Sequence, residues 1–300
     1  MPQRVLVVNL EELPWEAVSR GRVNAIRRKR LPMESGVAGA TFEYSYSIVP
    51  AGYFTPRHRH NFDQIRFTTY GVQSTGLGDL APGECGYFPE GAYYGPQAQK
   101  EECGSLVLQF QGASGEHLLS NEEMNLTYQR MIAAGAKFEN GVYTAYKPDG
   151  KKINKDSYVA IWEEHEGRKL NFPKPRYRQP VMMTSDRFRW VPDRARPGAE
   201  TKHLMTFTEY RNEISMLRLL PNAALPAGAQ PEVELRYLLE GSVDYGGRRW
   251  NKDTYFFLPA GAWVEAMQTS SGASFFCITL SMISALSAEK SGAEATATAS

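Results

Sequence analysis

The stretch that decides the fold is TPRHRHNFDQIRFTTYG, residues 55–71. Polar and apolar residues alternate along its second half, as in a β-strand with one buried face. Its even positions carry four polar side chains that would share that face: His58, His60, Gln64 and Arg66. Burying such a set is costly unless its members are held together by partners or by a ligand.

A second copy of this stretch lies 170 residues further along the chain. QIRFTTYG corresponds to ELRYLLEG, and YFPEGA corresponds to FLPAGA, at this one offset. The same offset carries Gly71 to Gly241 and Pro89 to Pro259. The coincidence of turn residues at a fixed spacing indicates two copies of one β unit.

Strand-like runs separated by Gly and Pro turns fill residues 36–113 and 201–283. Short strands at such spacing are typical of all-β barrels or sandwiches. We expect residues 1–35 to form N-terminal strands or an arm, and residues 114–200 to form a connector. The tail at 284–300 is rich in Ala, Ser, Thr and Glu and is expected to be disordered.

The connector contains the one helix that we expect, near residues 120–134. Ser120 and Glu123 have the spacing of a capping box, and Gly135 or Gly141 can end the helix. The remainder of the connector is rich in Lys, Arg, Pro and aromatic residues.

The spacing around the two histidines resembles the first sequence motif of the cupin superfamily. That motif is Gly, five residues, His-x-His, three or four residues, Glu, six residues, Gly. Gly52, His58, His60 and Gly71 fit it, but Gln64 stands where Glu is usual.

The second cupin motif, Gly, five residues, Pro-x-Gly, two residues, His, is matched in part. Gly83, Pro89 and Gly91 fit, but Tyr94 stands where His is usual. The resemblance implies a bicupin, with two antiparallel double-stranded β-helix (jelly-roll) barrels and one connecting helix.

His58 and His60 at positions i and i+2 of a strand can reach one metal ion. We expect one divalent transition metal (Fe, Mn, Ni or Zn) held by His58, His60, Gln64 and Tyr94. The alternatives are a structural histidine pair, a hydrogen-bonding Gln64 and a Tyr94 that is an aromatic side chain at the barrel mouth.

Tyr94 and Arg66 are the candidate catalytic residues, Tyr94 as a base and Arg66 as a substrate contact. An interior guanidinium needs a partner, which could be a substrate carboxylate or enolate. The alternative is an internal ion pair, since Arg236 follows Glu234 by two residues in the second copy.

The second copy lacks the predicted metal ligands. Gly228 and Gln230 replace the two histidines, and Val264 replaces the last ligand, so that only Glu234 remains. One carboxylate does not make a transition-metal site. We expect a scaffold barrel that packs against the first barrel or a second chain, as in a homodimer; the alternative is a metal-free ligand pocket.

The other histidines are scattered at positions 117, 165 and 203. His165 lies in the acidic run WEEHEG and is expected to be solvated. It could bind a metal only if the connector folds over a barrel mouth. The basic cluster at residues 27–30 is expected to be a solvated loop or edge, or else an anion-binding patch.

Composition narrows the function classes. With 42% hydrophobic and 22% charged residues, the chain reads as a soluble globular protein. A net charge of +1 argues against nucleic-acid and membrane partners. Three cysteines without metal or redox spacing, and no signal peptide, lead us to expect a cytoplasmic protein.

Cupins with open metal positions imply dioxygenases, decarboxylases, isomerases and lyases acting on small oxygenated molecules. We therefore expect a metal-dependent enzyme with its chemistry in the N-terminal barrel. The substrate would be a small acid, enolate or aromatic molecule. The alternative is a metal-free or non-catalytic bicupin that binds a small molecule.

Overall fold

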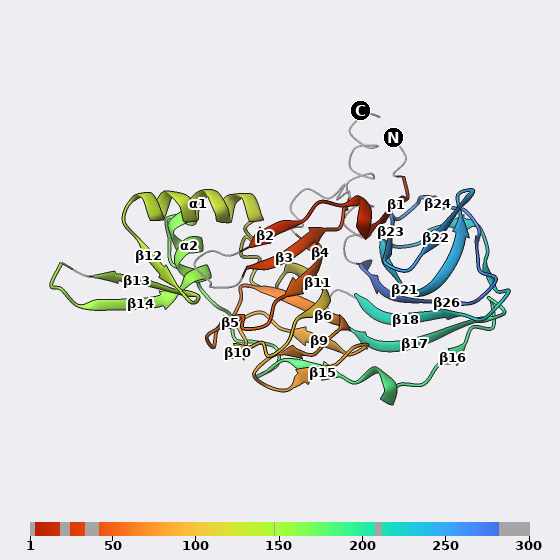
Figure 1. Cartoon of the computed structure of the whole chain (residues 1–300), viewed down its shortest axis with the longest axis horizontal. Coiled ribbons are helices and arrows are strands. Elements are labelled where there is room, and N and C mark those ends of the chain that lie inside the picture. The colour runs from red at the N-terminus through yellow and green to blue at the C-terminus, as the bar shows by residue number, and fades with distance from the viewer. Residues whose placement is uncertain (1–3, 19–24, 34–41, 147, 208–211, 282–300) are drawn as a thin grey trace, which may run out of the picture. The chain divides into compact units, whose positions relative to one another are not determined.

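The computed structural model describes residues 4–18, 25–33, 42–146, 148–207 and 212–281 (Figure 1). The chain divides into two compact units, each built on one large curved antiparallel sheet. We call the unit that contains the two histidines the first barrel and the other the second barrel. The predicted disordered tail lies outside the described residues.

The first barrel is a seven-stranded sheet with two small flanking strand pairs. Its strands are β2 (Glu16–Val18), β3 (Ile26–Arg30), β4 (Phe42–Val49), β5 (Phe54–Thr55), β6 (Phe62–Tyr70), β7 (Gln73–Ser74), β8 (Asp79–Leu80), β9 (Cys85–Phe88), β10 (Gln97–Ala98), β11 (Cys103–Gln111) and β15 (Val181–Met183). The order in the large sheet is β15-β9-β6-β11-β4-β3-β2, and β5–β10 and β7–β8 form the small pairs.

The second barrel repeats this plan. Its strands are β1 (Leu6–Asn9), β16 (Val191–Pro192), β17 (Ala199–Thr206), β18 (Glu213–Leu219), β19 (Ala224–Leu225), β20 (Gly228–Ala229), β21 (Glu234–Tyr245), β22 (Arg248–Asn251), β23 (Thr254–Leu258), β24 (Trp263–Val264), β25 (Met267–Gln268) and β26 (Ala273–Thr279). The order is β1-β23-β21-β26-β18-β17-β16, with β22, β25 and β19 joined at its side and β20 paired with β24.

Strand pairing in the two barrels follows the sequence repeat residue by residue. His58 forms an isolated antiparallel bridge with Tyr94. Their counterparts at the offset of 170, Gly228 and Val264, pair in the same way in β20 and β24. The register between β6 and β9 is likewise repeated between β21 and β23. The inferred pair of β units is therefore confirmed in the fold.

Each barrel is completed by a strand from outside the two repeated regions. β1 pairs with β23, with Leu6 opposite Phe257. β15 takes the equivalent place beside β9, with Val181 opposite Tyr87. β2 and β3, which precede the first repeat, extend the sheet of the first barrel. Neither barrel is thus one continuous stretch of chain.

The connector holds two α-helices and a small sheet where the sequence predicted one helix. α1 (Asn121–Ala133) begins at Ser120 with the predicted capping box. α2 (Ser157–Glu166) was not expected. It begins after Asp156, whose side chain caps it, and ends at Gly167 in the left-handed conformation. A three-stranded sheet is formed by β12 (Lys137–Glu139), β13 (Val142–Tyr146) and β14 (Lys152–Asp156).

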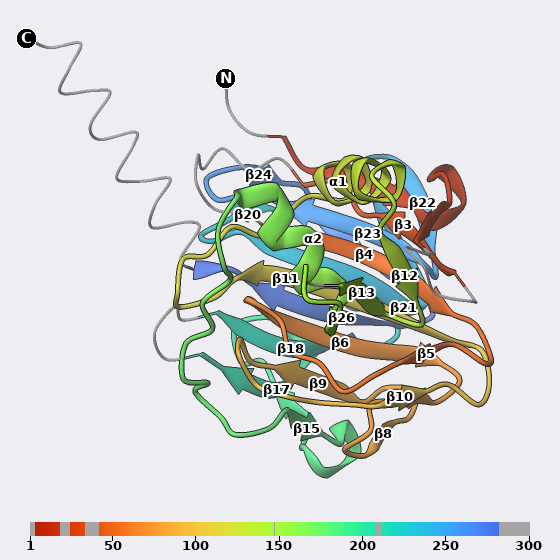
Figure 2. The same cartoon turned by 90° about the vertical axis from the view of Figure 1, so that its left-hand side faces the viewer.

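The two helices pack against each other around a small core that includes the buried Ile161 and Trp162. Figures 1 and 2 show α1 and α2 at one end of the first barrel. In the part of the chain that the structure describes, no helix has the length and hydropathy needed to cross a membrane.

Candidate functional site

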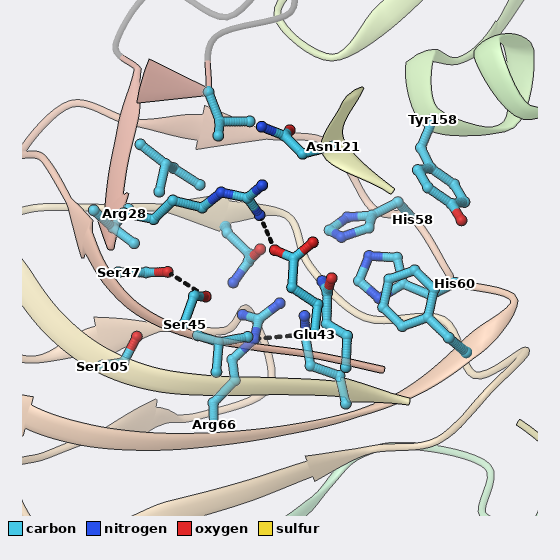
Figure 3. A pocket seen from close by; sticks show the side chains of 18 of the residues that line it. Arg28, Glu43, Ser45, Ser47, His58, His60, Arg66, Ser105, Asn121 and Tyr158 are labelled. Atoms are coloured by element: carbon cyan, nitrogen blue, oxygen red, sulfur yellow. Dashed lines mark hydrogen bonds and ion pairs between the residues drawn. The ribbon is translucent and has the colours of Figure 1, made fainter. Parts of the chain in front are cut away.

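A cavity of about 200 Å³ lies in the first barrel, and the predicted histidines line it. Strands β3, β4, β6 and β11 supply polar side chains to its walls. The chain leading into α1, both helices and the short strands β7 and β10 also contribute to the lining. Figure 3 shows His58 and His60 on one side of this cavity, facing the arginine and serine side chains. The connector therefore covers the barrel on the side of the histidines.

His58 and His60 lie side by side at the cavity wall, with ring centroids 5.0 Å apart. The Nδ1 atom of His58 lies 2.7 Å from the carbonyl oxygen of Pro56, which can only accept a hydrogen bond. Nδ1 must therefore carry the proton, which makes Nε2 the atom with the lone pair. The His60 ring stacks on Phe62, with centroids 4.4 Å apart.

Gln64, Arg66 and Tyr94 are joined by hydrogen bonds behind the histidines. Arg66 donates from Nε to the Gln64 side-chain oxygen at 2.6 Å, and from Nη2 to the Tyr94 hydroxyl at 2.7 Å. The Tyr94 hydroxyl also lies 3.2 Å from Nε2 of His60. Tyr94 is 1% exposed and does not line the cavity, whereas Gln64 and Arg66 do. All five predicted site residues are thus brought together.

The second barrel contains a carboxylate partner for its equivalent arginine, which Arg66 does not have. There Arg236 donates to both carboxylate oxygens of Glu234, at 2.8 and 3.0 Å. Burial alone would raise the pKa of Glu234, but the adjacent guanidinium holds that pKa below its ordinary value. In the first barrel the equivalent partner is the neutral Gln64. No carboxylate among the described residues forms an ion pair with Arg66; its guanidinium has two neutral hydrogen-bond acceptors and lies over the Phe88 ring, 4.3 Å from the ring centroid.

Arg28 and Glu43, which sequence reasoning missed, form an ion pair at the cavity wall (Figure 3). Arg28 also lies 3.3 Å from Glu16. Its Nη2 atom and the Ser105 hydroxyl are buried without a hydrogen-bond partner within the described chain. The solvated reading of the basic cluster is therefore wrong for Arg28, and also for Lys29, which is 7% exposed.

A signal for Glu43 was present in the sequence. In TFEYSYSIV, polar Glu43, Ser45 and Ser47 alternate with larger residues, which places them on one face of β4. That face proves to be the cavity wall. Nothing comparable marks Arg28, because its partner lies on a different strand.

Of the four predicted metal ligands, the imidazoles of His58 and His60 are well suited to bind a metal ion. The side-chain oxygens of Gln64 and Tyr94 are less well suited, because both accept hydrogen bonds from Arg66. Nε2 is the lone-pair nitrogen of the neutral His58 ring, and Nε2 of the neighbouring His60 ring lies 3.2 Å from the Tyr94 hydroxyl. The Gln64 oxygen already accepts from Arg66, although a carbonyl oxygen keeps a second lone pair. No third His, Cys, Asp or Glu among the described residues completes a set with the two histidines.

A different group does bring three such side chains together in the connector: His117, Glu123 and His165. Their ligand atoms lie within 4.8 Å of one another, so this group could hold a metal ion. The histidines that looked scattered in the sequence are neighbours here, because α1 and α2 pack together. The three cysteines are buried free thiols and join no such group within the described residues.

No protein-family model matches the sequence, and no curated protein matches it. Solved structures do resemble it. A protein of Nostoc punctiforme whose proposed activity is that of a dioxygenase has a TM-score of 0.66 and 17% identity. That match covers 93% of this chain and 83% of the other.

Two further structures match at TM-scores above 0.5. The oxalate decarboxylase of Bacillus subtilis has a TM-score of 0.53 and 13% identity, covering 92% of this chain and 76% of its own. A protein of Pseudomonas aeruginosa, proposed to be glyoxylate-induced, has a TM-score of 0.54 and 11% identity, covering 94% and 90%. At these identities the likeness concerns the fold. The chain therefore has an all-β fold of two cupin-type antiparallel barrels.

Proposed function

We propose that the first barrel is the site of a metal-dependent enzyme acting on a small oxygenated carboxylic acid. The observation that carries this proposal is the buried guanidinium of Arg66, which has no ion-pair partner among the described residues, beside two imidazoles in one cavity. The reaction class is that of dioxygenases, decarboxylases, isomerases or lyases. The similar structures named for dioxygenase and oxalate decarboxylase activity support this range.

An anionic substrate supplies the carboxylate partner that Arg66 lacks. A guanidinium taken out of water without a counter-charge is costly, and a carboxylate offers it a planar two-oxygen partner. The second barrel achieves this compensation with Glu234. In the first barrel the neutral Gln64 stands at the position of Glu234. The guanidinium of Arg66 can therefore form an ion pair with a bound carboxylate ligand.

Each residue then has a role that follows from its contacts. A divalent ion, when bound by His58 and His60, would polarise the oxygen atoms of the substrate. Arg66 holds the substrate carboxylate. Tyr94 lies behind Arg66 and His60, and its hydroxyl fixes the orientation of both. We therefore assign Tyr94 a positioning role rather than a place among the metal ligands.

Two further polar groups of the cavity lining can bind the other end of the substrate. Within the described residues, Nη2 of Arg28 and the hydroxyl of Ser105 have no hydrogen-bond partner; both atoms are buried, and both residues line the cavity. Such groups gain hydrogen bonds when a polar substrate atom enters. A small acid with a second oxygen function, such as a hydroxyl or keto group, fits this arrangement.

A second candidate function is metal-free binding of the same class of acid. It is favoured by the hydrogen bonds from Arg66 to both oxygen atoms that a metal would need, those of Gln64 and Tyr94. Reconstitution of the purified protein with Fe(II), Mn(II), Ni(II) or Zn(II), followed by product analysis with and without oxygen, separates the two functions. Turnover with any of these metals supports the enzyme.

Replacing Arg66 by Met tests the acid site. We expect binding of small carboxylic acids to weaken by about 2 kcal/mol or more, which is about 30-fold in Kd, because a buried charge-assisted contact is lost. Isothermal titration calorimetry with a panel of hydroxy, keto and dicarboxylic acids measures this loss.

The matched control is Arg57→Met, since Arg57 is an exposed arginine next to His58 and its guanidinium lies 4.8 Å from the Tyr93 ring. This control should bind acids as the unchanged protein does. Equal acid affinity in the Arg66 and Arg57 variants would refute the proposed role of Arg66.

A further inference from the structure

The connector brings two histidines and a glutamate into one cluster near the ends of its helices. Nε2 of His117 lies 3.7 Å from one carboxylate oxygen of Glu123, and Nε2 of His165 lies 4.0 Å from the other. The two imidazole centroids are 6.2 Å apart. The three side chains come from different segments: the loop before α1, the first turn of α1, and the end of α2.

The capping box fixes Glu123 as a carboxylate at the centre of this cluster. Its Oε2 accepts the backbone N–H of Ser120 at 2.7 Å, while its own N–H donates to the Ser120 hydroxyl. The first turn of α1 therefore presents an anionic ligand that is held in place.

His117 is held in an orientation that suits metal binding. Its Nδ1 atom lies 3.0 Å from a carboxylate oxygen of Glu166, which must accept its proton. Its backbone carbonyl accepts hydrogen bonds from Asn61 and from the Trp162 indole, at 2.9 and 2.8 Å. An imidazole that donates from Nδ1 to a carboxylate offers Nε2 to a metal, which is a recurring arrangement in metal sites.

The imidazole of His165 is oriented by a hydroxyl group so that its Nε2, like that of His117, faces Glu123. Its Nδ1 lies 3.1 Å from the hydroxyl of Thr127, which stands one helical turn after Glu123 on α1. Its Nε2 is thereby turned toward Glu123. Both imidazoles thus have one nitrogen engaged by an orienting group and the other directed at the same carboxylate.

We propose that His117, Glu123 and His165 bind one divalent ion of the zinc class, with water as the remaining ligand. Two imidazoles and one carboxylate are a common ligand set for zinc. Tetrahedral bonds of 2.0–2.2 Å place ligand atoms about 3.4 Å apart, so small movements of partly exposed side chains would complete the site. It is separate from the barrel cavity, which none of the three lines, and does not rest on the proposed function.

Such an ion would fasten together the segments that cover the cavity. Leu118, Leu119 and Met124 line that cavity and lie next to or between the proposed ligands along the chain. Tyr158 and Ile161 of α2 line it too. The ion would therefore act as a structural clamp on one wall of the first barrel.

Titration of the chelator-treated full chain with Co(II), followed by its visible spectrum and by competition with Zn(II), tests the proposal. We expect a site of low coordination number that survives His58→Ala with His60→Ala and is lost in His117→Gln with His165→Gln. In the His58→Ala, His60→Ala background, Zn(II) should raise the Tm, and adding His117→Gln with His165→Gln should abolish this rise.

Two further variants separate loss of metal binding from loss of folding and from loss of an unrelated histidine. Glu123→Gln keeps a side chain that can serve in a capping box, so helix content by circular dichroism should be unchanged while metal affinity falls at least tenfold. His203→Gln removes an exposed histidine of the second barrel that pairs with Glu213, and metal affinity should not change. If Co(II) binding in the His58→Ala, His60→Ala background is unchanged by both the His117/His165 and the Glu123 substitutions, the site does not exist.

Discussion

Replacing both His58 and His60 by Ala is expected to remove the metal ion from the first barrel and to reduce turnover to background. Two of the strongest donors in the cavity are lost, and the Gln64 oxygen, already shared with Arg66, cannot hold a divalent ion alone. The fold should survive, because the second barrel maintains the same strand pairing with Gly228 at the first of these positions.

Metal content by elemental analysis measures this effect best when the connector ligands are also changed. In a chain that already carries His117→Gln and His165→Gln, every tightly bound ion would belong to the barrel. The far-ultraviolet circular dichroism and Tm of the variant report on its fold. Full metal content after loss of both barrel histidines would show that they are a structural pair.

Gln64 of the first barrel and Glu234 of the second occupy equivalent positions. Exchanging these two side chains is expected to change acid binding in the first barrel and stability in the second. Gln64→Glu should give Arg66 the ion pair that Arg236 has in the second barrel, so that acid binding weakens while metal binding tightens. Glu234→Gln should leave Arg236 buried without a counter-charge. Removal of one partner from a buried ion pair costs about 3 to 5 kcal/mol, so this variant should be markedly less stable.

Urea unfolding of the two variants and calorimetric titration with small acids measure the exchange. The two substitutions occupy equivalent positions of β6 and β21, so each is the control for the other. An Arg66 that still binds acids with unchanged affinity beside Glu at position 64 would contradict the electrostatic explanation. A Glu234→Gln variant as stable as the unchanged chain would contradict the expectation that Arg236 needs a buried counter-charge.

The barrels were predictable because turn residues constrain backbone geometry locally. Gly71 and Gly241 both adopt positive φ, at 64° and 81°, and a side chain at either would collide with backbone within 3 Å. Such positions must recur wherever the same turn recurs, and an offset of 170 reveals them. The start of α1 was predictable for the same reason, since Ser120 and Glu123 satisfy each other within one turn.

Contacts between distant segments were not predictable. The approach of His117 to His165 depends on how α1 packs against α2, and no local pattern encodes that angle. The ion pair of Arg28 with Glu43 depends on the register between β3 and β4. The missed helix α2 is different, because its Asp156 cap and terminal Gly167 were readable signals.

The contact between β1 and β23 has a consequence for synthesis of the chain on the ribosome. The hydrogen bond between Asn9 and Thr254 spans 245 residues. At about 5 to 20 residues per second, β1 waits about 12 to 50 s for its partner to be made. β2 and β3 need only β4, which follows within a few dozen residues. The first barrel can therefore begin to fold during translation, whereas the second must wait until its last strand, which ends at Thr279, has emerged.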